Sequence, residues 1–335
     1  MSEKLSQKDR VKWIDMARGF AMLLIIVGHC AGIPETLKHI IFSFHVPLFF
    51  ILSGYVYRHK EKSVLKDFKQ LIAPYIISVF IIIIFNIYAN KAISGDYILQ
   101  TLKSALYAYG SDYGEIKLIG GLWFLPTIFV TRRFMNLAFS IDMKEHCRAV
   151  VFLFFTFLGV QISRYVWVPL NIDVALIASG FMYVGYLLKT FRININLDIL
   201  LGCFLIWIGA VKTGTLEMST RVYDPWPVIF CGSVAASICV IYFCEKLEKI
   251  KILQWALSFV GLHTILLLCI HDLDWRLPFD VYWGFLQQFQ GERIYFFMSV
   301  LCRMGFDLAV MCVILAAVKI LKEIRGKFWR RYERT

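Results

Sequence analysis

Long apolar stretches alternate with short charged segments along most of this 335-residue chain. A helix needs about 20 mostly apolar residues to cross a bilayer, and ten stretches approach that length. Most faces of these stretches are apolar, so hydrophobic periodicity does not subdivide them further. We predict ten membrane-spanning helices, over residues 13–31, 40–57, 72–89, 119–138, 149–166, 172–189, 197–212, 226–244, 253–271 and 295–318.

The charges between these stretches indicate the orientation. Of the 36 Lys and Arg residues, 25 fall on the side that holds both chain ends and 9 on the other, where the longest loop is roughly 90–118; the remaining two, Arg18 and Arg303, lie within spans. Cytoplasmic loops carry the excess of Lys and Arg in membrane proteins. We therefore predict an all-α integral membrane protein with both termini cytoplasmic. Residues 1–335 would form one transmembrane domain with a basic tail at about 319–335, in the cell inner (plasma) membrane.

Composition agrees with this class. The chain is 59% hydrophobic and 16% aromatic, with a mean hydropathy of +0.65, above the apolar content of soluble domains. The net charge of +12 lies in short segments between apolar runs, which indicates cytoplasmic loops and not a nucleic-acid interface. The nine cysteines include no CxxC motif, so buried core roles are favoured for them.

The first two predicted spans contain ionisable residues, which are costly in a bilayer and usually mark a function. Asp15 and Arg18 lie in the cytoplasmic third of the first span. His29 follows Arg18 by 11 residues, about 16 Å along a helix at ~1.5 Å per residue. His29 is therefore expected in the outer half, where His45 begins the second span.

Further polar and aromatic residues are expected at the depth of His29. Trp123 begins the fourth span there, and His271 ends the ninth, with His263 two turns deeper. A metal site, haem ligation and purely structural histidines are alternatives, but HxxxH and HExxH pairs are absent from the sequence, so no metal is predicted. A neutral imidazole can also take a proton from a hydroxyl near neutral pH, so general-base catalysis is the third possibility.

Arg18 has two possible partners. Asp15, three residues earlier on the same helix, would satisfy it as an ion pair. Alternatively, an anionic ligand could enter from the cytoplasm. Lys66 and Lys69, before the third span, would then join Arg18 around phosphate groups of a nucleotide-containing donor.

Five groups of residues resemble the membrane acyltransferase-3 family. The resemblance is strongest over 13–75 and runs through most of the chain. At Lys66 and Lys69 the family has two arginines, and at Thr264 it usually has serine. The matching groups are Asp15-x-x-Arg18-Gly19 with Gly28-His29, Phe44-His45-Val46-Pro47-Leu48-Phe49-Phe50 with Ser53-Gly54-Tyr55, Lys66-Asp67-Phe68-Lys69 with Pro74-Tyr75, Trp123-Phe124-Leu125, and Gly261 through His271.

This resemblance implies a ten-helix O-acyltransferase that moves acetyl from acetyl-CoA, a co-substrate and not a bound cofactor, to a sugar hydroxyl. The subgroup it looks most like modifies surface carbohydrate in the manner of fucose O-acetylases. The family's catalytic histidine and its partner arginine correspond to His29 and Arg18. The donor would meet Lys66, Lys69 and Arg18. Residues on the acceptor side or in supporting roles would be His45, Trp123, His271, Asp15 and Ser53.

Two other classes of protein compete with an enzyme. A transporter or flippase of a sugar or lipid-linked glycan also has many spans and intramembrane charge. Such proteins tend to show interrupted helices and a repeat between their halves. Neither is evident in the sequence, although Pro47, Pro126 and Pro278 could break helices. A membrane sensor without catalysis is the third class.

Overall fold

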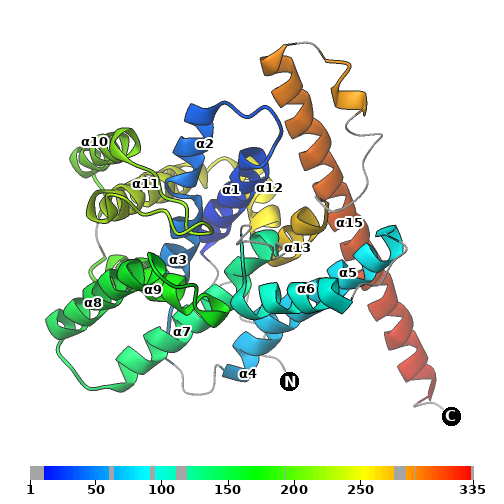
Figure 1. Ribbon diagram of the computed structural model, residues 1–335, viewed down its shortest axis with the longest axis horizontal. Helices are drawn as coiled ribbons and strands as arrows, with labels where there is room; N and C mark the ends of the chain where they lie inside the picture. The colour runs from blue at the N-terminus through cyan, green and yellow to red at the C-terminus, as the bar shows by residue number, and fades with distance from the viewer. Residues whose placement is uncertain are drawn as a thin grey trace.

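A computed structural model describes residues 11–59, 64–90, 95–110, 119–192, 194–274, 284–289 and 291–332. The described part is helical, with one isolated antiparallel bridge between Glu217 and Val222 (Figure 1). In chain order the helices are α1 (Lys12–Gly28), α2 (Glu35–Phe42), α3 (His45–Tyr55), α4 (Val64–Asp67), the π-helix η2 (Phe68–Ile72), α5 (Ala73–Asn90), α6 (Gly95–Tyr107), the 3-10 turn η3 (Gly120–Trp123), α7 (Phe124–Ser140), α8 (Glu145–Ser163), the 3-10 turn η4 (Pro169–Asn171), α9 (Ile172–Thr190), α10 (Leu197–Thr213), α11 (Trp226–Leu247), α12 (Lys251–Leu262), α13 (Thr264–Asp274) and α15 (Glu292–Tyr332).

All ten predicted apolar stretches fall on helices, but two of them are broken. The stretch 40–57 divides into the end of α2 and α3, with Ser43 and Phe44 between them. The stretch 253–271 divides into α12 and α13, which are bent by 70° at His263. The prediction of one continuous helix was therefore wrong for 253–271, whereas Glu35–Tyr55 still counts as a single candidate span despite the two-residue turn. Hydropathy records the apolar length of a stretch but not the local hydrogen bonds that end a helix.

Two segments outside the predicted spans are helical in the structure. The predicted outer loop at 90–118 contains the helix α6, while residues 111–118 lie outside the described part. The predicted basic tail at 319–335 is not separate from the last span, because α15 continues to Tyr332. The segment contains no Pro that would break the helix.

Six helical segments in the described ranges are long and apolar enough to cross a bilayer, or seven if the bent pair α12–α13 forms one span. Three more of the predicted spans, α1, α7 and α10, have 17 residues each, the lower end of the usual range of about 17–25. The fold is that of a helical membrane protein. Ten spans and the orientation of the termini remain predictions.

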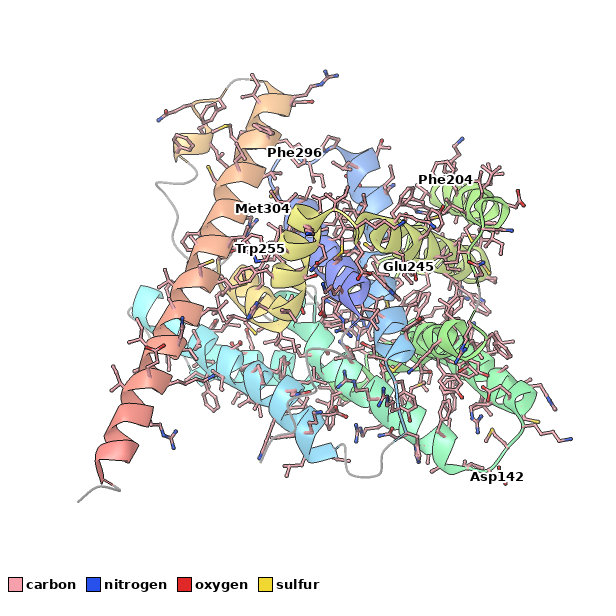
Figure 2. The ribbon with its side chains drawn as sticks, turned by 180° about the vertical axis from the view of Figure 1, so that it is seen from behind. Asp142, Phe204, Glu245, Trp255, Phe296 and Met304 are labelled. Carbon is pink, nitrogen blue, oxygen red and sulfur yellow. The ribbon has the colours of Figure 1, made fainter. Side chains whose placement is uncertain are left out.

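The outside of the bundle is apolar. Phe204 on α10 and Trp255 on α12 are 45% and 69% exposed, and Figure 2 shows Phe204 at the periphery of the bundle. Other large exposed apolar side chains lie on α5, α8 and α15. A water-soluble monomer rarely exposes this much apolar surface, whereas a lipid-facing surface is expected to be apolar.

Helix α1 lies in the middle of the bundle, and α15 runs along one edge (Figure 1). The closest neighbour of α1 is α12. Their backbones approach each other at Gly19 and Gly261, where an added Cβ would collide with the carbonyls of Leu257 and Asp15. Small residues permit such close helix contact in membranes. The crossing fixes α1, and with it Arg18 and His29, against the broken helix pair.

Candidate functional site

A cavity of about 890 Å³ opens between α1, α3, α7 and the broken pair α12–α13. Its wall includes most of the residues that the sequence singled out. Asp15 is buried on α1 beside the cavity. Lys66 and Lys69 are exposed and lie outside the described cavity wall. The predicted site residues that line it are Arg18, His29, His45, Ser53, Trp123 and His271.

Three cavity histidines sit where helices end. The last carbonyls of a helix lack intrahelical donors, and a histidine N–H can satisfy one of them. A carbonyl only accepts, so each Nδ1 must carry the proton and each Nε2 the lone pair. The Nδ1 atoms donate at 2.8 Å to the carbonyl four residues earlier: His29 to Ile25, His45 to Ile41 and His263 to Phe259.

The rings of His29, His45 and His271 form one group at one end of the cavity, with Phe42 between the first two. The centroids of His29 and His271 are 5.6 Å apart. Phe42 lies 5.6 Å from His29 and 4.9 Å from His45. The structure therefore brings together imidazoles from α1, α3 and α13, as the predicted depths required. We call this the histidine end.

Trp123 lines the cavity from a turn that packs beside the histidine end. It ends the η3 turn, where Gly120 has a left-handed φ of 67° and lies so close to Asp272 that a Cβ would collide with the carboxylate. Only glycine adopts this backbone at no steric cost. The turn therefore packs beside Asp272, next to His271 in sequence.

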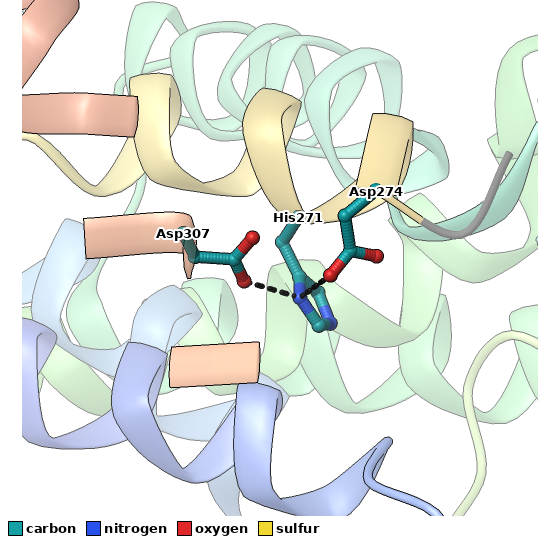
Figure 3. Close-up of side chains that lie close together, drawn as sticks. All are labelled: His271, Asp274 and Asp307. Carbon is teal, nitrogen blue, oxygen red and sulfur yellow. Dashed lines mark hydrogen bonds and ion pairs between the residues drawn. The ribbon is translucent and has the colours of Figure 1, made fainter. Parts of the chain in front are cut away.

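His271 differs from the other cavity histidines because its partner is a carboxylate. Its Nδ1 lies 2.8 Å from Oδ2 of Asp307 on α15 and 3.8 Å from Oδ2 of Asp274 on α13. Figure 3 shows the imidazole between the two carboxylates. Its Nε2 is buried and has no hydrogen-bond partner among the described residues. A buried polar atom of this kind requires an explanation.

Arg303 on α15 connects the two imidazole groups. Its Nε and Nη2 donate to both oxygens of Asp274, at 2.8 and 2.5 Å. Its Nη1 donates to the backbone carbonyl of His29 at 2.9 Å. One guanidinium thus holds the C-terminal end of α1 against α13, and the planar fork suits this bidentate contact.

The other end of the cavity carries arginines. Trp123 lies beside the histidine end, and Arg132 follows it by nine residues, about 13 Å along α7 at ~1.5 Å per residue. Arg18 and Arg132 both line the cavity, with side chains 25% and 27% exposed. Arg18 forms an ion pair with Asp15 at 3.7 Å. We call this the arginine end.

Asp67 organises the arginine end. This buried residue accepts from Arg132 at 2.6 Å and also pairs with Arg133. It lies between Lys66 and Lys69 in the sequence, so those two lysines flank the segment that docks on α7. The structure thus places Arg132, and neither lysine, in the cavity wall.

A connecting loop between α10 and α11 completes the wall with Leu216 to Ser219. Arg221 anchors this loop through a buried ion pair with Asp173 at 3.1 Å and hydrogen bonds to Asn171 and to the Ser219 carbonyl. Its guanidinium also lies 3.4 Å from the Trp167 ring centroid. The loop is therefore held in place on α9.

The residues that sequence reasoning did not single out include Arg303 and Asp307 on α15 and Asp67 and Arg132 at the arginine end. Arg303 counted only as a charge within a span, and Asp307 lies four residues later. Two ionisable residues on one face of an apolar span are a signal that could have identified the pair. The pairing of Asp67 with Arg132 had no such signal, because it joins two segments far apart in the sequence.

A family model described as an acyltransferase domain matches residues 11–318 of the chain. No curated protein and no solved structure matches the chain.

Proposed function

The chain belongs to the acyltransferase-3 family, and from this premise we propose that it is an O-acetyltransferase of the membrane. It moves acetyl from acetyl-CoA to a hydroxyl of a cell-surface carbohydrate or of its lipid-linked precursor. One observation carries the proposal: Arg18 and His29 line the same cavity of about 890 Å³. An anion-binding group and a proton-accepting group are thus joined by one continuous space.

The donor enters at the arginine end. The phosphates of acetyl-CoA pair with Arg18 and Arg132, and Lys66 and Lys69 attract them from the cytoplasmic approach. The pantetheine arm then extends along the cavity. About 16 Å separate Arg18 from His29 along α1 at ~1.5 Å per residue, and the shared cavity provides the path between them. Acetyl-CoA is a co-substrate here, and no bound cofactor takes part.

The acyl transfer takes place at the histidine end. The Nε2 lone pair of His29 either takes the proton of the acceptor hydroxyl or attacks the thioester and carries the acetyl transiently. His45, Ser53 and Trp123 shape the acceptor side of the cavity. Asp15 supports Arg18 through their ion pair.

The membrane arrangement belongs to the same proposal. Ten spans with both termini cytoplasmic account for the Lys and Arg distribution. This orientation puts the arginine end on the cytoplasmic side, where acetyl-CoA is made, and the histidine end in the outer half of an inner (plasma) membrane.

A transporter or flippase is the second candidate, and the broken pair α12–α13 favours it. Discontinuous helices commonly line transport sites, and this break at His263 lies on the cavity wall. The family match supports the enzyme instead. The two differ in a measurable way, because a transporter moves glycan without consuming acetyl-CoA.

The test uses membranes that contain the full chain, incubated with labelled acetyl-CoA, with label counted in the polysaccharide and lipid-linked glycan fractions. We expect His29→Ala to lower incorporation at least ~100-fold, the usual range for a lost acid–base or nucleophilic group. His146→Ala, an exposed histidine on α8, is the matched control and should retain wild-type incorporation at equal protein level.

The possible failures separate the parts of the proposal. Near-normal incorporation by His29→Ala would remove the assignment of His29. No wild-type label in either glycan fraction would remove the carbohydrate acceptor. Glycan movement without consumption of acetyl-CoA would favour the transporter.

A further inference from the structure

Helix α15 is mostly exposed but buries one narrow polar face. Ser299 and Asp307 are fully buried and Arg303 is 9% exposed. The three residues are spaced by four, which places them on one side of a helix. Ser299 accepts from the backbone N–H of Ala31 at 3.0 Å. The same face holds the carbonyl of His29 through Arg303 and the imidazole of His271 through Asp307.

Asp307 determines which nitrogen of His271 carries the proton and which has the lone pair. An ionised carboxylate only accepts, so Nδ1 carries the proton and Nε2 has the lone pair. That Nε2 is the buried atom without a partner among the described residues, and His271 lines the cavity beside His29. The imidazole ring of His271 is surrounded by Asp307, Asp274 and Arg303. It cannot turn without breaking the hydrogen bond between its Nδ1 and Asp307.

The cluster also has the composition of a metal site, since donor atoms of His271, Asp274 and Asp307 lie within 4.8 Å of one another. Arg303 argues against a metal ion. Its guanidinium is bonded to both oxygens of Asp274, so a cation already compensates that carboxylate. A metal ion would have to displace this buried ion pair.

The charges around His271 suit an imidazole that gains a proton. The groups near it are His29 on α1, Asp272 and Asp274 on its own helix, and Arg303 and Asp307 on α15. From α5, Tyr75 is already engaged, because its hydroxyl donates to the Ala105 carbonyl at 2.7 Å. With ionised carboxylates, Asp272, Asp274, Asp307 and Arg303 carry two net negative charges. A proton on His271 would reduce that charge to one.

We infer that His271 is a second catalytic residue, the base that takes the proton of the acceptor hydroxyl, and that Asp307 is its positioning residue. The inference rests on the proposed function and deepens it. A carboxylate stabilises an imidazolium better than the carbonyl that holds His29. His271 is therefore the better proton acceptor, and His29 is left to contact the acetyl group.

In the transfer step, the hydroxyl proton moves to Nε2 of His271 while the acceptor oxygen bonds to the acetyl carbon. The bond from that carbon to its carrier then breaks, and the electron pair goes to the CoA sulfur, or to Nε2 of His29 if the acetyl was passed there first. The imidazolium of His271 returns its proton to the CoA thiolate. The products are the acetyl ester and CoA.

The test measures the pH–rate profile of label transfer from acetyl-CoA to glycan in membranes that contain the full chain. We expect Asp307→Asn to lower the rate about 10²–10⁴-fold. The acidic limb should also move to lower pH, because the imidazolium loses its counter-charge. Asp307→Glu, which keeps the carboxylate, should restore the limb in part. His271→Asn should lower transfer at least ~100-fold at equal protein level.

Ser299→Ala is the matched control, because it removes a contact of the same helix face without touching the imidazole. It should keep the wild-type profile. The inference is overturned if Asp307→Asn keeps the wild-type limb and rate, if Ser299→Ala shifts the limb equally, or if His271→Asn transfers normally. In each of these cases the proposed function would still hold, provided that the wild-type protein transfers label and His29→Ala does not. Absence of wild-type transfer would remove both.

Discussion

The two ends of the cavity use charged side chains in opposite ways. At the histidine end, His271, Asp274 and Asp307 are buried and Arg303 is almost so, and each is fixed by side-chain or backbone partners. At the arginine end, Arg18 and Arg132 are about a quarter exposed and face the cavity. Buried groups lose solvent and keep one geometry, whereas partly exposed groups keep their hydration until a ligand arrives.

This difference matches the two tasks of an acyl transfer. Proton transfer requires atoms held within hydrogen-bond reach of the reacting hydroxyl. Holding a flexible, highly charged donor requires cations that can adjust to phosphate oxygens. Substitutions at the histidine end should therefore affect stability and rate, and substitutions at the arginine end should affect the KM for acetyl-CoA.

The largest effect on stability should come from Arg303→Gln. This change leaves Asp274 buried without its cation and frees the end of α1, and breaking a buried ion pair costs about 3–5 kcal/mol. Thermal unfolding of the detergent-solubilised protein measures it. Arg293→Gln, an exposed site on the same helix, should change stability by no more than about 0.5 kcal/mol. Equal stability of the two variants would show that the histidine end is not held by α15.

An intermediate effect is expected from Arg132→Gln. Asp67 keeps its ion pair with Arg133, so the fold should persist while the cavity loses one cation. Loss of a charged hydrogen bond of about 1.5–3 kcal/mol raises the KM for acetyl-CoA roughly 10–100-fold, with a smaller change in kcat.

Arg133→Gln is the matched control for Arg132. It removes the other partner of Asp67 but lies outside the described cavity wall. Its KM for acetyl-CoA should stay near the wild-type value even if stability falls. A larger rise in KM for Arg133→Gln than for Arg132→Gln would contradict the assignment of the donor to the cavity.

The smallest effect is expected when Lys66 and Lys69 are both changed to Gln. Both side chains are exposed, and exposed charges contribute about 0–1 kcal/mol and are screened by salt. We expect at most a ~3-fold rise in the KM for acetyl-CoA at low salt and none at high salt. A tenfold rise that persists at high salt would move the donor site from the cavity to the segment around η2.

Several features of the site were predictable from individual residues. Asp15, Arg18, His29 and His45 stand out because ionisable residues in apolar spans are costly. The proximity of His29, His45 and His271 was predictable by counting residues along spans of predicted direction. Asp307 was overlooked because its meaning depends on His271, 36 residues away in the sequence.

The sequence by itself determined the helices, since an apolar stretch of bilayer length has nowhere else to satisfy its backbone. It also determined the family, through the residue groups around Arg18, His29 and His45. Only the tertiary structure decided where α12–α13 breaks, which cations line the cavity and which imidazole has a carboxylate. Those features depend on how each helix is rotated against its neighbours, and in segments that are apolar on most faces the hydrophobic pattern does not encode that rotation.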